Sequence, residues 1–256
     1  MRLDSVYRVT PKLQRADPQE VDALARWLAA ALPTGYRDHV ATLGRGTYHG
    51  LWMVRMPQDV RAGCADRQAF LREHFDDLWG EAPSLPRDEA MSAVSFAHSV
   101  DGDEAFYSRS RHRLFVLPRH SDRVHWVPQD VDDPLDWLPR ADRDADGAAD
   151  SFRYFDSGQA RQIVELFTAV SLEMEATVRD IDRHFRPAHR LDGHGGTLLF
   201  LPAIHGSVQL TQAAGDGRIR IRLAHDTDCA TAVAPLLADW KAQGFRETWR
   251  HPPHAG

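Results

Sequence analysis

The sequence predicts an α+β protein in which antiparallel sheets are flanked by helices. In several segments apolar residues recur three and four positions apart, which is the period of an amphipathic helix. Between residues 91 and 128 the period changes to two, which is typical of strands separated by short polar turns. With 256 residues, 43% of them hydrophobic, the chain is long enough to bury a substantial core.

Two helices are expected near the N-terminus. The first begins at Asp17-Pro18-Gln19-Glu20, because an acid at the N-cap, a proline after it and a glutamate three residues on are typical of a helix start. It should end at Leu32-Pro33, and its buried face comprises Val21, Leu24, Ala25, Leu28 and Leu32. The second helix covers residues 35–43 and ends at Gly44, which suits the left-handed position after a helix.

The next expected elements are a strand over residues 48–56, ended by Pro57, and a helix over residues 66–79. The inward side chains of this helix are expected to be Phe70, Leu71, Phe75 and Leu78, with Gly80 at its end. Strands over 91–98 and 104–108 flank the Asp101-Gly102 turn, and strands over 113–118 and 123–128 form a second pair. Together with the strand at Tyr48 they predict an antiparallel meander with helices on one face.

A short apolar helix containing Leu135, Trp137 and Leu138 closes this part of the chain, and residues 141–150 read as an acidic linker. The sequence therefore predicts a first domain over residues 1–140 and a smaller α+β domain over residues 151–256. In the second domain we expect a long helix, three strands and a last helix. The long helix starts at Ser157 and carries the stripe Ile163, Phe167, Val170, Met174, Val178, Ile181 and Phe185. The strands cover 197–201, 207–212 and 218–223, and the last helix covers 228–243 with Pro235 inside it.

The run from Leu32 to Gly44 resembles the opening of the SUKH superfamily, with Leu32, Pro33, Tyr36, Val40 and Gly44 matching its pattern. His39 stands where that family usually has an aromatic residue. The resemblance continues through 94–97, the turn at 101–103, the strands at 106–107, 114–116 and 124–127, and the segment 135–138. It covers about the first 140 residues. Members include a yeast regulator of cell-wall glucan synthesis and many bacterial immunity proteins.

This resemblance implies a compact α+β domain that presents a sheet and adjoining loops to a protein partner, in bacteria typically a secreted toxin. It implies no catalytic apparatus. The composition is compatible with this, because a formal net charge of −6 disfavours nonspecific nucleic-acid binding and fits a basic partner better. No segment has the length and apolarity of a membrane span, and the N-terminus lacks the pattern of a signal peptide, so a cytoplasmic location is expected.

Two groups of acidic residues, each beside large aromatic rings, are the candidate partner-binding site. Charge on such loops steers encounter with a basic partner, while aromatic rings supply buried contact area. The candidate residues are Asp101, Asp103, Glu104, Tyr107, Trp126, Asp130, Asp132 and Asp133. Ordinary turn chemistry, in which Asp is favoured, explains the same residues equally well.

No cofactor or metal is expected. The segment 142–147 places acids at positions one, three and five of a calcium-like loop, but Arg153 occupies position twelve, where a glutamate belongs. His112, His120 and His125 lack the spacing of a zinc pair, and Cys64 and Cys229 fit two small core residues. The glycine-rich runs 44–46 and 193–196 precede strands rather than helices, so they read as turns.

Arg218, Arg220 and Arg222 alternate with apolar residues, so the predicted strand has one apolar face and one row of guanidinium groups. Such a row can grip carboxylates or phosphates, although a solvated strand face with acids on its neighbours explains it too. The sequence as a whole favours a non-enzymatic immunity protein that neutralises a toxin. The alternatives are a metal-dependent enzyme that uses the acids or histidines, and a scaffold or regulator of cell-envelope synthesis.

Overall fold

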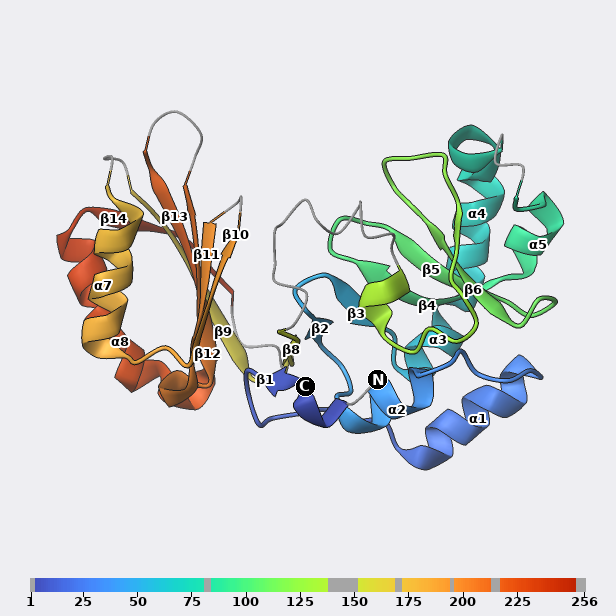
Figure 1. The fold of residues 1–256 in the computed structure, drawn as a ribbon, viewed down its shortest axis with the longest axis horizontal. Helices are drawn as coiled ribbons and strands as arrows, with labels where there is room; N and C mark the ends of the chain where they lie inside the picture. Colours follow the sequence, from blue (N-terminus) through green and yellow to red (C-terminus); the bar gives the residue numbers. More distant parts are fainter. Residues whose placement is uncertain are drawn as a thin grey trace. The chain divides into compact units, whose positions relative to one another are not determined.

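The computed structural model describes residues 3–80, 84–137, 152–168, 172–193, 196–212 and 217–251 (Figure 1). The protein is α+β and divides into two compact units. The first unit holds the described residues of Met1–Val6, Leu13–Arg143 and Arg153–Asp156, and the second those of Tyr7–Lys12, Asp144–Phe152 and Ser157–Gly256. The expected linker, residues 141–150, and the expected helical residue Leu138 lie outside the described residues. Among the described helices, none combines the length and the apolar composition needed to cross a bilayer.

In the first unit the strands lie side by side in the order β8-β2-β3-β4-β5-β6-β7, and neighbours run antiparallel. From β3 to β7 this order follows the chain, as the expected meander requires. The strands are β2 (Thr47–Tyr48), β3 (Trp52–Val54), β4 (Val94–Ser99), β5 (Glu104–Ser108), β6 (Arg113–Leu117), β7 (His125–Trp126) and β8 (Tyr154–Asp156). The 3-10 helices η1 (Leu3–Ser5) and η2 (Pro134–Trp137) complete the unit, and the second confirms the short apolar helix.

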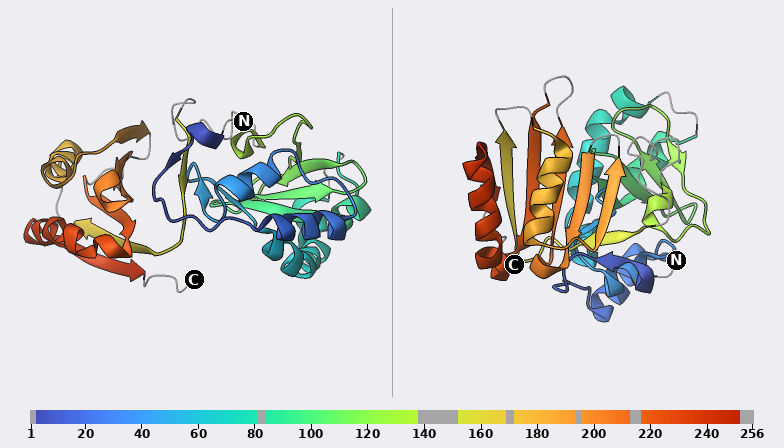
Figure 2. Two further views of the ribbon diagram at one scale, coloured as in Figure 1. Left: turned by 90° about the horizontal axis from the view of Figure 1, so that it is seen from below. Right: turned by 60° about the vertical axis from the view of Figure 1, so that its left-hand side comes forward.

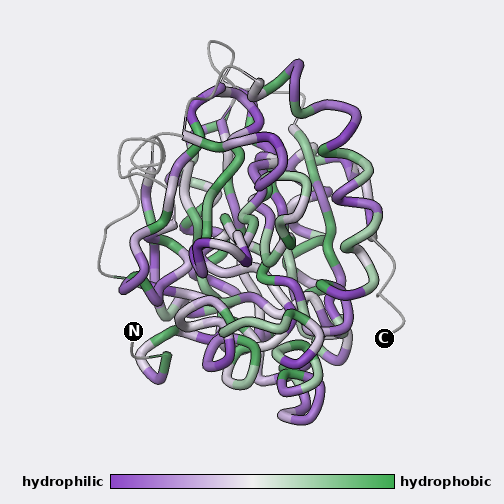
Figure 3. Tube along the Cα trace, turned by 90° about the vertical axis from the view of Figure 1, so that its right-hand side faces the viewer, coloured by the Kyte–Doolittle hydropathy of each residue, from purple (hydrophilic) through white to green (hydrophobic). Residues whose placement is uncertain are grey.

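Helices cover both faces of this sheet, so the prediction that they cover one face was wrong. α1 (Pro18–Leu28), α2 (Tyr36–Thr42) and α3 (Pro57–Ala62) join the core that contains Tyr107 and Val116. α4 (Cys64–Trp79) and α5 (Arg87–Ser92) join a second core around Phe106 and Phe115. The reason is visible in β5 and β6, where consecutive residues are buried, and a strand buried on both sides needs cover on both sides. Many of the outer turns are hydrophilic (Figure 3).

The expected strand over 48–56 is two short strands joined by a turn. His49 and Gly50 both have positive φ, 54° and 68°, which is the conformation of the tightest hairpin turns. β2 and β3 therefore pair with each other at Tyr48 and Trp52 instead of running on as one strand.

The end of α1 and the buried face of α4 also differ from the prediction. α1 has the expected cap, with the Gln19 amide donating to the Asp17 carboxylate at 2.8 Å, but it ends at Leu28 because Ala29 takes the left-handed conformation at φ 52°. In α4 the expected inward residue Leu78 is 44% exposed, and Trp79 is buried in its place. α3 and α5 were not expected.

The second unit is a six-stranded antiparallel sheet in the order β10-β11-β12-β13-β9-β14. Its strands are β9 (Arg161–Thr168), β10 (His189–Gly193), β11 (Gly196–Leu201), β12 (Gly206–Gln212), β13 (Ile219–Asp226) and β14 (Phe245–His251). α7 (Met174–His184) and α8 (Ala230–Ala242) pack on one face of this sheet, as the right view of Figure 2 shows. The short helices η4 (Pro202–Ile204) and η5 (Thr227–Cys229) lie at strand ends, and β1 (Tyr7–Arg8) belongs to the segment Tyr7–Lys12.

The long helix expected from Ser157 to Phe185 is wrong, and with it the arrangement of one helix, three strands and one helix. Residues 161–168 form β9, and a helix starts only at Met174. Ile163 and Phe167 are four residues apart, which fits one face of a helix and equally one face of a strand. Burial resolves this ambiguity, because Val164, Leu166 and Thr168 are buried at alternate positions.

The three expected strands and the last helix are present as β11, β12, β13 and α8. The last helix includes Pro235 and begins at Ala230, two residues later than expected. β10 and β14 were missed. β10 is exposed along most of its length and β14 is rich in charged residues, so neither shows the apolar alternation by which strands are recognised.

Candidate functional site

The most distinctive surface lies on the second sheet, on the face opposite α7 and α8. Ile219, Ile221 and Leu223 of β13 are fully buried under the two helices. Side chains alternate along a strand, so Arg220 and Arg222 project from the opposite face, where both are exposed. The sequence prediction of one apolar and one guanidinium face is therefore confirmed for this strand.

The strand register extends this face into two cross-strand rows. Gln209 of β12, Arg222 of β13, Glu165 of β9 and Trp249 of β14 are paired in one row. Thr211, Arg220, Phe167 and Arg246 are paired in the next. Paired residues in neighbouring strands lie on the same face at roughly 5 Å. The rows therefore form a continuous patch across four strands.

One carboxylate occupies the centre of this patch. Glu165 accepts from Arg220 at 2.6 Å, and its other oxygen lies 4.0 Å from Nε of Arg222. The guanidinium of Arg218 lies 6.0 Å from the centre of the Phe167 ring, which places it on the same face. We call these nine residues the arginine face: Glu165, Phe167, Gln209, Thr211, Arg218, Arg220, Arg222, Arg246 and Trp249.

Trp249 is exposed because β14 contains a bulge. The register shifts between Glu247 and Trp249, so an extra residue, Thr248, is accommodated at this edge strand. Its hydroxyl donates to the backbone carbonyl of Glu165 at 3.3 Å. The Trp249 side chain is left 46% exposed beside the guanidinium groups. A large exposed ring next to arginines has the composition of a protein-binding hot spot.

The other end of the same sheet face is closed by the segment Tyr7–Lys12 and by Phe152. The centre of the Tyr7 ring lies 5.3 Å from that of Phe200 and 5.0 Å from that of His189. The Phe152 ring also contacts Phe200 and His189. The Thr10 hydroxyl donates to the fully buried Asp226 at 3.0 Å, and Lys12 pairs with Asp228 at 2.5 Å. This end is thus filled by the chain itself.

Asp226 also accepts from Arg161 at 3.0 Å and lies 3.3 Å from Nδ1 of His205. His205 has φ 44°, a left-handed conformation that is unfavourable for a non-glycine residue. A carboxylate that orients an imidazole is a component of several hydrolytic sites. Here the carboxylate is shared among Thr10, Arg161 and His205, which gives it a structural role in fixing the segment Tyr7–Lys12.

The predicted partner residues in the first acidic group are used inside the first unit. Glu104 is 8% exposed and accepts from Arg55 at 2.9 Å, from Ser95 at 2.6 Å and from Arg67 at 3.5 Å. Tyr107 is 2% exposed and packs its ring against Phe96 in the core. Both residues support the fold rather than face solvent.

The turn next to Glu104 keeps one accessible acid. Asp103 accepts from the Ser99 hydroxyl and the Arg119 amide, both at 2.9 Å, so it stabilises the turn. Gly102 supplies the positive φ of 96° that this turn requires. Asp101 is exposed.

In the second acidic group Asp133 is buried and accepts from the Leu135 amide at 3.0 Å, from Tyr48 at 3.4 Å and from Arg153 at 3.4 Å. Burial, with the Asp133 carboxylate close by, raises the pKa of Tyr48. Asp130 is exposed and Asp132 is half-buried.

Trp126 is half-buried and is the outermost ring of an aromatic row. Its ring centre lies 5.1 Å from that of Phe115, which in turn stacks on Phe106 at 5.7 Å. The indole donates to the Ser84 carbonyl at 3.2 Å, and Arg111 lies 4.5 Å above the ring. These contacts assign Trp126 to packing on the second core of the first unit.

The two acidic groups do not meet. Glu104 pairs with Leu117 at the end of β6, whereas Gln129, next to Asp130, bonds to the carbonyl of Arg111 before β6 begins. They lie at opposite ends of the strands, about 15 Å apart for a strand of this length. The eight residues expected to form one surface are therefore distributed over two buried polar clusters, the two cores of the first unit and two separate turns.

The histidines and cysteines occupy unrelated places. His112 lies at φ 50° in an exposed turn, His120 is exposed, and His125 is half-buried in β7. Within the described residues, no group of three metal-ligating side chains comes together. The calcium-like run 142–147 lies outside those residues. Cys64 and Cys229 are free, half-buried thiols packed against the two units' cores, and burial raises the pKa of each.

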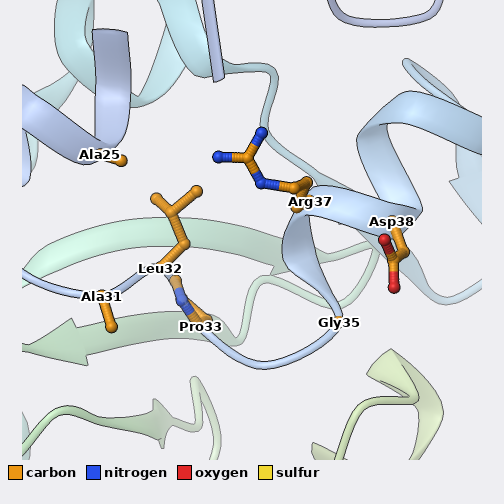
Figure 4. A pocket seen from close by; sticks show the side chains of 7 residues that line it. All are labelled: Ala25, Ala31, Leu32, Pro33, Gly35, Arg37 and Asp38. Atoms are coloured by element: carbon orange, nitrogen blue, oxygen red, sulfur yellow. The ribbon is translucent and has the colours of Figure 1, made fainter. Parts of the chain in front are cut away.

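The first unit has an open depression of about 380 Å³ beside α1 and α2, lined by Ala25, Ala31, Leu32, Pro33, Gly35, Arg37 and Asp38 (Figure 4). Its wall includes the Leu32-Pro33 segment. Arg37 pairs with Asp22 at 2.7 Å, and both side chains are about half exposed. The depression offers four apolar side chains, those of Ala25, Ala31, Leu32 and Pro33, and the charged groups of Arg37 and Asp38, which is little chemistry for a ligand.

Comparisons with protein-family models, with curated proteins and with solved structures gave no match.

Proposed function

We propose that this chain is a non-enzymatic protein-binding protein and that the arginine face is its principal contact surface. The observation that carries the proposal is Trp249, 46% exposed on a helix-free sheet face among Arg220, Arg222 and Arg246. Trp and Arg are the residues most enriched among those that dominate binding energy at protein interfaces. A rigid sheet backed by α7 and α8 presents them without the entropy cost of ordering a loop.

The biological form of this activity that we propose is neutralisation of a toxin by an immunity protein. The support is the resemblance of the first 140 residues to the SUKH superfamily, which implies a protein partner and no catalysis. Asp101 and Asp130 lie in separate turns, so an acidic contact to a basic toxin would involve one of them at a time. The arginine face is the larger continuous surface, and it is the surface to test first.

The experiment is coexpression of this chain with the protein encoded beside it, followed by isolation of the complex and measurement of cell growth. We expect a stoichiometric complex and protection from growth arrest. Trp249→Ala should weaken the complex by about 2 kcal/mol, roughly thirtyfold in Kd, because an anchoring ring is lost.

The matched control is Trp27→Ala, which removes the exposed tryptophan of α1 in the first unit. It should leave the affinity unchanged. Protection without a complex, or equal affinities of wild type and Trp249→Ala, would contradict the proposal.

A further inference from the structure

We propose that the arginine face docks an acidic segment of the partner protein, whose carboxylates bind Arg220, Arg222 and Arg246 beside Trp249. This inference rests on the proposed function and names the chemistry of its partner. It departs from the basic partner expected from the net charge and the acidic loops, because neither describes the charge of this face.

The charges of the second unit are segregated. Residues 157–256 contain eleven Arg and Lys and eleven Asp and Glu, so this part of the chain is balanced. The arginine face carries four guanidinium groups and a single carboxylate, Glu165. Many of the acids lie elsewhere, as Asp180 and Asp182 on α7 and Asp239 on α8. The face is therefore strongly positive while the unit as a whole is not.

Glu165 shows how a carboxylate is held on this face. One of its oxygens accepts from Arg220 at 2.6 Å, while Arg222 approaches the other only to 4.0 Å. Within the described part of the chain, no carboxylate pairs with Arg246, the exposed member of the adjoining row on β14. Arg222 and Arg246 retain guanidinium donors for further carboxylates, which they can grip in bidentate geometry.

The surroundings favour a peptide over a nucleic acid. A single strand of nucleic acid binds by stacking successive bases on exposed rings, and Phe167 is half-buried with Arg218 above it. Gln209 and Thr211 flank the arginines and can bond to peptide groups, and Trp249 offers contact area to an apolar side chain. An acidic segment with apolar residues between its acids satisfies all of these groups.

The test uses the full chain and three labelled probes. The first is a peptide that alternates Glu and Leu over about eight residues, a length that spans the four strands of the patch. The other two are the matching Lys and Leu peptide and a short single-stranded oligonucleotide. Binding is measured by fluorescence anisotropy from low to high salt. We expect binding of the acidic peptide alone, weakening as salt rises. The variant Arg220→Gln/Arg222→Gln/Arg246→Gln should raise its Kd by about tenfold or more and flatten the salt dependence.

The control variant Arg179→Gln/Arg183→Gln/Arg186→Gln removes the same charge from exposed positions on and after α7, the helix-covered side. It should bind the peptide as wild type does. The single variant Arg246→Gln, whose side chain is exposed, keeps the test valid if the triple variant fails to fold, and it should raise Kd by a few-fold.

Tighter binding of the oligonucleotide, self-association through the same arginines, equal loss in the control variant, or no binding of the acidic peptide would each overturn the inference. If the complex with the coexpressed partner depends on Trp249 but is unchanged by the arginine substitutions, the proposed function stands and this inference falls.

Discussion

Thr10 and Asp226, which are 216 residues apart in the chain, meet in the second unit, where the Thr10 hydroxyl donates to the fully buried carboxylate at 3.0 Å. The contact ties an N-terminal segment to the sheet formed by the last hundred residues. Lys12 and the Tyr7 ring reinforce the attachment through Asp228 and Phe200. The second unit therefore includes a short segment, Tyr7–Lys12, that lies in sequence between two parts of the first unit.

Replacement of Thr10 by Val should destabilise the protein by about 1–3 kcal/mol, because the isosteric side chain leaves an oxygen of a buried carboxylate without its hydroxyl donor. Urea denaturation of wild type and variant measures the difference. Thr34→Val is the control, since the Thr34 hydroxyl bonds to the Gln129 carbonyl at an exposed position. An equal effect of both substitutions would show that the buried contact adds nothing.

Part of the arginine face could be predicted from the sequence, and part could not. The alternation of Arg218, Arg220 and Arg222 with apolar residues predicted β13 and its guanidinium row correctly, because strand period is a local property. The acid that pairs with this row, Glu165, was placed on a helix, because its neighbours Ile163 and Phe167 fit both periods. Trp249 was not predicted as a site residue, because it lies in an edge strand without apolar alternation.

For the acidic residues, the sequence predicted a shared surface site that the structure does not contain. Asp101 and Glu104 look alike in a turn-rich sequence, yet one is exposed and the other is enclosed by Arg55, Arg67 and Ser95. Arg55 and Arg67 are 49 and 37 residues from Glu104, so their convergence depends on how α4 packs on the sheet. No local pattern predicts such a contact.

These two acids are predicted to differ sharply in mutational cost. Glu104→Ala should destabilise the protein by about 3–5 kcal/mol, because it leaves the partly buried guanidinium of Arg55 without its carboxylate. Asp101→Ala, at the exposed position three residues earlier, should stay within about 0.5 kcal/mol of wild type. Chemical denaturation of the two variants side by side measures this. A small effect of Glu104→Ala would place the cluster on the solvated surface.

Loss of the N-terminal cap of α1 should destabilise the protein by less than the loss of Glu104. Asp17→Ala removes the carboxylate that accepts from the Gln19 amide at 2.8 Å, and we expect about 1 kcal/mol of destabilisation. Asp17→Ser retains a capping oxygen and should recover most of it. The denaturation midpoints of the three proteins give the comparison, and identical midpoints would mean that the cap contributes nothing to stability.

The purified protein is expected to hold no stoichiometric zinc or calcium. The histidines at 112, 120 and 125 lack ligand spacing, and Arg153 stands where the calcium-like run from Asp142 needs a glutamate. Elemental analysis after dialysis against metal-free buffer checks this. One tightly held ion per chain would contradict it.

His39 is fully buried, and neither of its ring nitrogens bonds to a described residue. Its ring packs edge-on against Tyr48 and Phe155, at 5.6 and 6.1 Å between centres. Burial lowers its pKa to about 4, because the apolar site disfavours the charged imidazolium. The unfolded chain, with an ordinary pKa near 6.5, binds a proton that the folded chain rejects.

The folded state thus binds fewer protons, so its stability rises with pH. The contribution of His39 to the free energy of unfolding is complete above about pH 6.5 and is lost as pH falls from there toward 4. Between pH 7.5 and pH 5 this loss amounts to about 2 kcal/mol. His39→Phe puts an aromatic ring without a titratable group in the same place, and the fall in unfolding free energy over that interval should shrink by about this amount. The pKa values of His98 and His225 are also lowered by burial, so part of the slope should remain in the variant. Urea denaturation of both proteins at the two pH values decides the matter, and equal slopes would mean that His39 takes up a proton in the folded protein as readily as in the unfolded chain.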